Sequence, residues 1–240
     1  MSLPRAYKTR GVILRGRHLG EADRIVTLFT SERGKIDAVA KGVRRAKSQL
    51  AGRLEFGNEC LLAMHRGRSL DIIVGADIEC AYWERIVEPE RFAAFSLVAE
   101  VIDGFCEPDL AMQDVYRLLT GVVGAIATLD DPARLIPRFS LLLLAALGLA
   151  PPVDVCVRCS APLIERAWLD ADSGGFIDDR CRERYRDFIE LERDDIANLQ
   201  TLAAPRGDER AALYATLPVT RAIEQLLAYH LGRQPKASIV

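Results

Sequence analysis

Three cysteines and one aspartate have the spacing of a metal site in the second half of the chain. Cys156 and Cys159 form a C-x2-C pair, and Asp178 and Cys181 follow after 18 intervening residues as D-x2-C. With cysteine at position 178 the pattern would match a zinc ribbon, in which two short turns each present two thiolates to one ion. Zinc also accepts carboxylate oxygens, so Asp178 could supply the fourth ligand. The spacing therefore predicts a structural zinc site made of these four side chains.

Two other interpretations of this segment stay open. The first is a finger that has lost its metal, because one oxygen ligand among thiolates should weaken zinc binding. The second is a redox-active CxxC, although the segment lacks the strand and helix pattern of thioredoxin-like folds. Zinc catalysis is not favoured, because no HExxH motif is present and the three histidines are distant in sequence. The remaining three cysteines are interpreted as buried thiols: Cys60, Cys80 and Cys106.

A second feature with chemical meaning is the uneven distribution of charge. The whole chain of 240 residues has a net charge of −2. The residues up to Leu70 include 15 basic and 6 acidic side chains, a net charge of +9, whereas the rest has 17 basic and 28 acidic ones, a net charge of −11. Opposite charges in two parts of one chain suggest two tasks, and the basic part is expected to contact a polyanion.

The excess positive charge is densest in residues 41–53. This segment, KGVRRAKSQLAGR, contains five basic residues and no acidic one, and it has no strand pattern. We interpret it as an exposed basic loop that contacts the polyanion. The alternative is a loop that is merely solvated in an arginine-rich chain.

The elements that must position these residues differ between the two halves. Five short strands are predicted in the first 80 residues, at 7–14, 24–30, 35–40, 59–65 and 70–80. A five-stranded OB-fold fits this count, and an SH3-like barrel fits it nearly as well. From Pro89 onward, apolar residues at three- and four-residue spacing predict helices. The helix from Pro132 towards Leu147 is apolar on most faces and should be central.

The predicted fold class is α+β with several domains. We expect an OB-fold domain at 1–80, a helical domain at 81–152 with 186–232, a zinc-finger-like insertion at 153–185 and a disordered tail at 233–240. The longest apolar stretch, residues 139–150, is too short to span a bilayer, which takes about 20 residues. The N-terminus has charges where a secretory signal would have its apolar region. A cytoplasmic protein with no membrane partner is therefore expected.

Motifs of common enzymes are absent from the sequence. It contains no Walker A motif, no GxGxxG and no nucleophile elbow. The acidic pairs at Asp130 and Asp194 are interpreted as helix starts. A binding protein is therefore favoured over an enzyme.

A longer run of residues resembles a known family. Residues 20–48 read GEADRIVTLFTSERGKIDAVAKGVRRAKS. The EADRIVTLFT strand, the ERGK turn and the basic loop that follows are similar to those of the bacterial recombination mediator RecO. The order of a strand-rich domain, a helical part and a CxxC finger is similar as well. One departure is Asp178, which stands after Gly174-Gly175 where the family often has a cysteine.

The resemblance implies an OB-fold that binds single- and double-stranded DNA, anneals complementary strands and helps to load the recombinase RecA at gaps during repair. It implies two protein partners, RecR and the acidic C-terminal tail of the single-stranded DNA-binding protein, and a cytoplasmic, nucleoid-associated location. No nucleotide hydrolysis is implied. The alternatives are a metal-dependent nucleic-acid hydrolase or modifying enzyme, and an adaptor whose basic face meets an acidic protein.

Two sets of basic residues are the candidates for these contacts. Because the first 70 residues contain few aromatic side chains, binding is expected to depend on the DNA backbone with little base stacking. The candidates for DNA contact are Lys35, Lys41, Arg44, Arg45, Lys47 and Arg53, with Arg15, Arg17 and Arg33 in support. Arg134 and Arg138 are one helical turn apart and could hold the acidic tail. Alternatively, these two arginines are only solvated.

Overall fold

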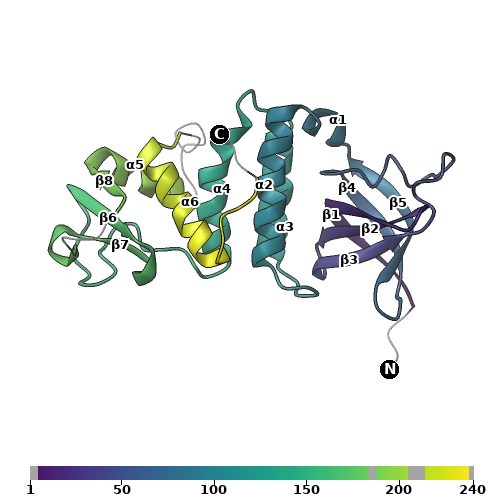
Figure 1. Cartoon of the computed structure of the whole chain (residues 1–240), viewed down its shortest axis with the longest axis horizontal. Helices are drawn as coiled ribbons and strands as arrows, with labels where there is room; N and C mark the ends of the chain where they lie inside the picture. Colours follow the sequence, from purple (N-terminus) through teal and green to yellow (C-terminus); the bar gives the residue numbers. More distant parts are fainter. Residues whose placement is uncertain (1–4, 184–187, 205–213, 238–240) are drawn as a thin grey trace. The chain divides into compact units, whose positions relative to one another are not determined.

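The first five strands form a closed barrel. The structure, a computed structural model, describes residues 5–183, 188–204 and 214–237. Its strands β1 (Ala6–Leu19), β2 (Asp23–Thr30), β3 (Gly34–Ala40), β4 (Glu59–His65) and β5 (Asp71–Cys80) pair in the order β1-β2-β3-β5-β4 (Figure 1). Only β3 and β5 pair in parallel. The predicted α+β fold with an N-terminal OB-like barrel is confirmed.

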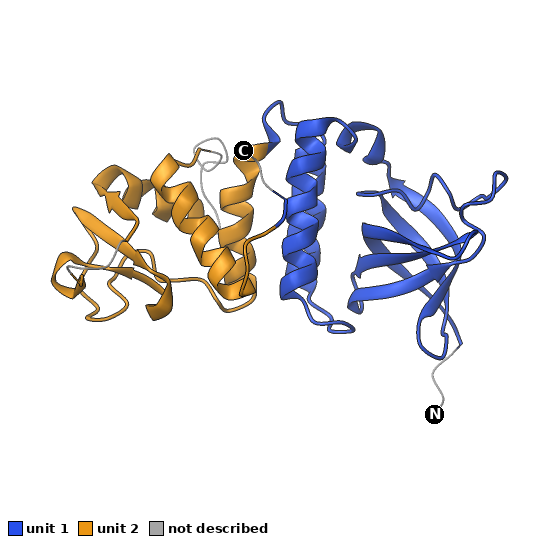
Figure 2. Cartoon of the chain, viewed as in Figure 1, with its two compact units in different colours: residues 1–132, 236–240 blue, residues 133–235 orange. Residues whose placement is uncertain are grey.

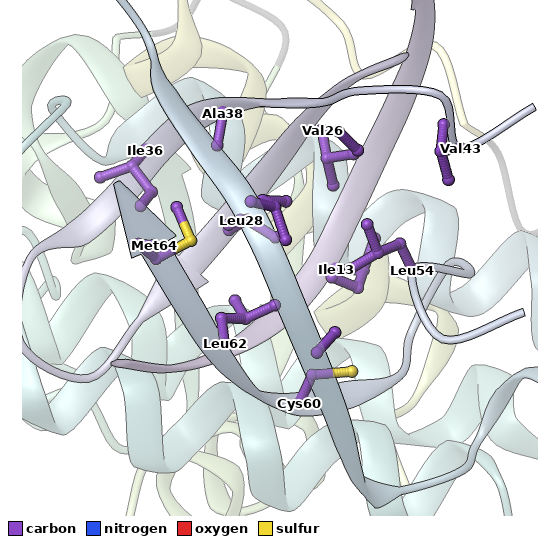
Figure 3. Packing of buried hydrophobic residues seen from close by; sticks show 13 residues of the cluster. Ile13, Val26, Leu28, Ile36, Ala38, Val43, Leu54, Cys60, Leu62 and Met64 are labelled. Carbon is purple, nitrogen blue, oxygen red and sulfur yellow. The ribbon is translucent and has the colours of Figure 1, made fainter. Parts of the chain in front are cut away.

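Alternation of apolar and polar residues builds the barrel. In β3, GKIDAVA, every second side chain points inward and is buried, as expected for a strand with one face in the core. The inward side chains of all five strands form one apolar cluster (Figure 3). Val43 and Leu54, from the segment between β3 and β4, also belong to this cluster. The basic loop is therefore anchored at both ends in the barrel core.

Strand β1 is longer than the sequence pattern predicted, because its two halves pair with two different strands. Its first half, Ala6–Val12, pairs with β4, and its second half pairs with β2 as far as the pair Leu19 and Asp23. An irregularity between Ile13 and Arg15 marks the change. Such a bulge bends a strand and lets it close a barrel.

Three helices complete the first of two compact units, which comprises Met1–Pro132 and Lys236–Val240 (Figure 2). They are α1 (Trp83–Ile86), α2 (Pro89–Phe105) and α3 (Gln113–Ile126). The first-turn proline of α2 is where a helix tolerates one. Its apolar residues Phe95, Val98 and Ile102 are fully buried.

The second unit comprises Ala133–Pro235 and contains helices around one small sheet. A 3-10 turn, η1 (Pro132–Arg134), leads into α4 (Leu135–Ala146), which packs against α5 (Arg193–Ala203) and α6 (Leu217–Leu231). The helix that was predicted to be central is thus α4. Its apolar face is buried, as the side chains of Phe139, Leu143 and Leu144 show. Strands β6 (Arg166–Asp170), β7 (Gly175–Ile177) and β8 (Glu190–Glu192) form a sheet in the order β7-β6-β8. Two further 3-10 turns are η2 (Ala171–Ser173) and η3 (Asp179–Cys181).

This division by contacts places α2 and α3 with the barrel and α4 to α6 with the cysteine segment. A domain is a part of the chain that folds independently, which is a different criterion from a division by contacts. The domain boundaries expected from the sequence therefore stay a prediction. Within the expected disordered tail, Lys236 and Ala237 donate backbone hydrogen bonds to the Glu100 carboxylate, at 2.9 to 3.0 Å. Residues 238–240 lie outside the described residues. Over the part of the chain that is described, the helices are too short or too polar to cross a bilayer.

Candidate metal centre and nucleic-acid interface

Two backbone turns bring the predicted metal ligands together. The first turn carries Cys156 and Cys159 and is closed by a hydrogen bond of 2.8 Å from the Ser160 N–H to the Cys156 carbonyl. The second is η3, where the Asp178 side chain caps the turn that ends at Cys181. The three sulfurs and one carboxylate oxygen all lie within 4.8 Å of one another. The four side chains singled out in the sequence thus form a cluster that could hold a metal ion.

Close packing between the two turns depends on a glycine. The Val157 N–H donates to the carbonyl of Phe176 in β7, at 2.9 Å. A Cβ atom at Gly175 would lie 2.7 Å from Val157 Cγ1 and 3.0 Å from Pro151 Cβ. A larger residue would push the strand away from the first cysteine turn. Gly175 therefore lets the second pair of ligands reach the first.

Asp178 is held from both sides. Its Oδ1 accepts a hydrogen bond from the Cys181 backbone N–H at 3.0 Å, and its Oδ2 accepts from Arg180 Nε at 3.0 Å and Nη2 at 2.9 Å. Burial alone would raise the pKa of Asp178, but the hydrogen bonds from Arg180 and Cys181 outweigh it and lower this pKa below its usual value. The carboxylate is therefore ionised at neutral pH, which is the form that binds metal.

The three thiols influence one another because they are close together. Burial raises the pKa of Cys156, but backbone hydrogen bonds from Asp178, Cys159 and Arg158 outweigh it and lower this pKa. The pKa of Cys181 rises to about 12, first through its hydrogen bond with Cys159 and then through burial. Negative charge thus collects on one thiolate and opposes ionisation of the next. A divalent cation would remove this opposition, and three sulfurs with one oxygen are donors that zinc accepts.

Sequence reasoning missed two residues that hold the cluster in place. The Arg158 side chain donates to the Cys181 carbonyl at 3.1 Å and to Asp170 Oδ2 at 2.5 Å. The Asp170 side chain has no exposed surface and also accepts from Ser173. Burial raises the pKa of Asp170, but Ser173 and Arg158 outweigh it and lower this pKa. The place of Arg158 inside the CxxC was the available signal, because a side chain there lies against both turns.

Of the nine cations predicted to contact DNA, five pair with carboxylates. Asp103 of α2 contacts Arg15 at 3.1 Å and Lys35 at 3.3 Å. The Lys35 ammonium also donates to the Asp103 carbonyl, and only 16% of its side chain is exposed. These two cations join α2 to the barrel, and Lys35 is poorly placed to meet a phosphate.

The other three paired cations lie on β1, in the turn between β2 and β3, and at the end of the basic loop. Arg17 contacts Asp37 at 3.3 Å, and Arg53 contacts Asp77 at 3.3 Å. Arg33 pairs with Asp71 at 2.5 Å and also with Asp109, and about a quarter of its side chain is exposed. Arg33 therefore ties the turn between β2 and β3 to neighbouring segments.

The remaining four cations all belong to the basic loop: Lys41, Arg44, Arg45 and Lys47. All four are exposed, and none takes part in an ion pair with another described residue. Arg44 fixes the loop against the turn between β1 and β2, because its Nη1 donates to the Glu21 carbonyl at 3.0 Å. Gly42 N–H donates to Asp23 Oδ1 at 2.7 Å. The structure thus brings four uncompensated charges together on an ordered loop.

The two arginines proposed for the acidic tail differ in their surroundings. Arg138 of α4 donates to the Leu202 carbonyl at 3.0 Å, so it caps the C-terminal end of α5. Arg134 lies in η1, before α4 begins, and is exposed. Arg138 therefore has a structural role in its own unit, and the tail site stays a prediction.

Comparisons with known proteins agree with this architecture. The family description "Recombination protein O N terminal" matches residues 1–81, and "Recombination protein O C terminal" matches residues 87–239. A DNA repair protein RecO from Frankia casuarinae is 36% identical over 181 residues, which are 73% of either chain. Those from Bifidobacterium adolescentis and Nocardioides are 39% and 34% identical, over 65% and 73% of this chain and 65% and 74% of theirs. The chain thus belongs to the RecO family of DNA repair proteins.

Proposed function

We propose that this protein is a recombination mediator that binds single- and double-stranded DNA without sequence preference. It anneals complementary strands and, together with RecR, helps to load RecA at gaps. The observation that carries the proposal is the basic loop, in which four of the five cations are exposed and form no ion pair with a described carboxylate. Each phosphate that such a cation neutralises releases condensed counterions, which favours binding of any sequence.

The barrel favours annealing over base recognition. Among the described residues up to Leu70, the aromatic side chains are Tyr7, Phe29 and Phe56, and Phe29 is fully buried. Phe56 packs against Phe92 and Phe95, with ring centroids 5.2 and 4.5 Å apart. Few rings are therefore free to stack on bases, and a strand held by its phosphates keeps its bases available for pairing.

We further propose that the cysteine cluster holds structural zinc. Four protein donors leave no open position for water or substrate, which is the arrangement of structural zinc sites rather than catalytic ones. Bound zinc would supply a cross-link between the two turns of the finger. The same reasoning argues against a metal-dependent hydrolase at this site and supports a mediator without catalytic activity.

The partners and the location are proposed from the family. RecR and the acidic tail of the single-stranded DNA-binding protein are the protein partners, and Arg134 and Arg138 are the candidate tail contacts. The protein is expected in the cytoplasm with the nucleoid.

The proposal is tested by the rate at which complementary oligonucleotides anneal without ATP, measured by fluorescence at several salt concentrations. The protein should accelerate duplex formation at low salt, and the double variant Arg44→Glu/Arg45→Glu should lose most of this acceleration. Arg117→Glu, on an exposed position of α3, is the control and should behave like the wild type. Absence of acceleration by the wild type at low salt would reject the proposal, and metal-dependent cleavage of a labelled strand would favour the hydrolase.

A further inference from the structure

The three thiols of the cysteine cluster differ in their access to solvent. Cys156 is 1% exposed and Cys181 is half-buried, whereas Cys159 is exposed. A cysteine that binds zinc does so as a thiolate, so a metal in the cluster keeps Cys159 in the form that reacts with oxidants. Oxidation of a thiolate also follows its exposure. Cys159 is therefore the sulfur of the cluster that a soluble oxidant meets first.

The two possible partners of Cys159 are held differently. The Cys156 sulfur accepts hydrogen bonds from the backbone N–H groups of Arg158, Cys159 and Asp178, which fix and cover it. Cys181 lies at the end of η3, where part of its surface is exposed, and its side chain forms hydrogen bonds with those of the other two cysteines. Cys181 is therefore better placed than Cys156 to form a bond with Cys159.

The sulfurs of Cys159 and Cys181 are close enough for a small movement to join them. The ligand atoms of the cluster all lie within 4.8 Å of one another. The S–S bond of a disulfide is ~2.05 Å long, so the two sulfurs would approach by at most ~2.7 Å. The new bond would connect the first cysteine turn to η3, which are the same two turns that a bound metal connects.

Asp178 makes the metal dependent on every thiolate of the cluster. A structural zinc site uses four protein donors. A finger with four cysteines that lost two of them to a disulfide would still have two thiolates. This chain would be left with the thiolate of Cys156 and the carboxylate of Asp178. One sulfur and one oxygen are too few donors to retain zinc, so the disulfide and the bound metal exclude each other.

We propose that Cys159 is an oxidation site, at which hydrogen peroxide forms a disulfide with Cys181 and the cluster loses its metal. This inference rests on the proposed structural zinc and does not depend on the proposed DNA binding. The finger would thus have two closed forms, one held by the metal and one held by the disulfide.

The oxidation has two steps. The Cys159 thiolate attacks one oxygen of the peroxide, the O–O bond breaks, hydroxide leaves, and Cys159 becomes a sulfenic acid. The Cys181 thiolate then attacks the Cys159 sulfur, the S–S bond forms, and the S–O bond breaks with loss of a second hydroxide. Both hydroxides take up protons to become water. The two sulfurs together lose two electrons, and the two oxygens of the peroxide gain them.

The test treats the full-length, zinc-loaded protein with hydrogen peroxide. A chromophoric chelator measures the zinc released, and a thiol reagent counts the free thiols. The protein should lose about one zinc ion and about two thiols per chain together. A dithiol reductant followed by zinc should restore both. Cys80→Ser, which changes a half-buried thiol outside the cluster, is the control and should release zinc like the wild type.

Peptide mapping identifies the cysteines that are joined. Trypsin cleaves after arginine, and it should place each cysteine of the cluster on a separate peptide by cutting at Arg158, Arg166, Arg180 and Arg182. After free thiols have been blocked, mass spectrometry of the unreduced digest should show the Cys159 peptide linked to the Cys181 peptide. A link between Cys156 and Cys159, or loss of zinc without any disulfide, would overturn the inference.

The variant Asp178→Cys tests why the metal is lost. It keeps two thiolates after the same oxidation, so it should release less zinc than the wild type at the same peroxide concentration. Equal release from the two proteins would overturn the argument from the number of donors. Zinc content measured before peroxide is added separates the two proposals. Protein without zinc would reject the structural zinc site, whereas bound zinc that peroxide does not release would reject the oxidation site alone.

Discussion

At the scale of single residues, Arg180 has a role that follows from its two hydrogen bonds to one oxygen of Asp178. These bonds leave Oδ1, which accepts only one N–H, as the oxygen with room for a metal. Three thiolates and a carboxylate around a divalent cation also carry excess negative charge, which a neighbouring guanidinium balances. Arg180 is therefore a positioning residue: it orients the carboxylate of Asp178, which stands where the family often has a cysteine.

We expect Arg180→Gln to weaken zinc binding by roughly 10- to 100-fold, the usual effect of removing a partner of a metal ligand. Competition with a chromophoric chelator measures the affinity, and the cobalt spectrum reports whether the ligand geometry changes. Arg180→Lys, which keeps the charge, should recover part of the affinity. Arg166→Gln, in the same small sheet, is the matched control. Equal zinc affinity in Arg180→Gln and Arg166→Gln would contradict this role.

Residue types and spacing were enough to find the four side chains that form the cysteine cluster, because a CxxC turn fixes its geometry locally. They were not enough to sort the basic residues. Lys35 and Arg33 have the same sequence signal as Arg45, but Asp103, Asp71 and Asp109 take up their charges. These carboxylates are 38 or more positions away in sequence. Only the packing of the barrel with α2 and with the segment after it brings them into contact.

At the scale of elements, the turn between β2 and β3 is where the chain after α2 contacts the barrel. The Asp109 N–H donates to the Lys35 carbonyl at 2.9 Å. Gly34 has a φ of +61°, and a Cβ atom there would lie 1.9 Å from the Leu110 carbonyl oxygen. The turn therefore needs glycine for its backbone conformation and for this close approach.

We expect Gly34→Ala to lower the free energy of unfolding by more than the ~1–2 kcal/mol that the left-handed conformation alone costs. Gly20→Ala is the matched control, because Gly20 has a φ of +60° but nothing within 4 Å of its Cβ position. Urea unfolding of both variants measures the difference. Similar losses in the two variants would mean that the contact with the Leu110 carbonyl does not constrain the fold.

The strands of the barrel could be predicted because alternation and turn residues are local signals. The sequence did not separate an OB-fold from an SH3-like barrel, since that choice depends on which strands pair. The parallel pair of β3 and β5 settles it, and it joins segments on either side of the basic loop. Nor did the sequence predict the full length of β1, because its two halves pair with different strands.

At the scale of the whole molecule, the basic loop and the metal cluster lie in different compact units. The charge pattern follows another boundary: residues 71–132 of the first unit have 3 basic and 13 acidic side chains, a net charge of −10, whereas residues 133–235 have 13 basic and 15 acidic ones, a net charge of −2. A polyanion should therefore contact the basic residues of the barrel and avoid the acidic stretch of residues 71–132, which repels phosphates.

We expect single-stranded DNA to slow amide hydrogen exchange in the basic loop and to leave exchange in α5 and β6 unchanged. Exchange measured by mass spectrometry with and without an oligothymidylate shows this, and high salt should remove the difference. Protection centred on the second unit would contradict the assignment of DNA binding to the barrel.

The hydrogen bonds from Lys236 and Ala237 to Glu100 have a consequence for synthesis of the protein. The barrel and α2 leave the ribosome before the second unit, yet Lys236 and Ala237, which contact Glu100, follow that unit in the sequence. The unit translated first thus receives one of its contacts only after the other unit has been completed. A chain truncated before Lys236 would lack these hydrogen bonds to Glu100.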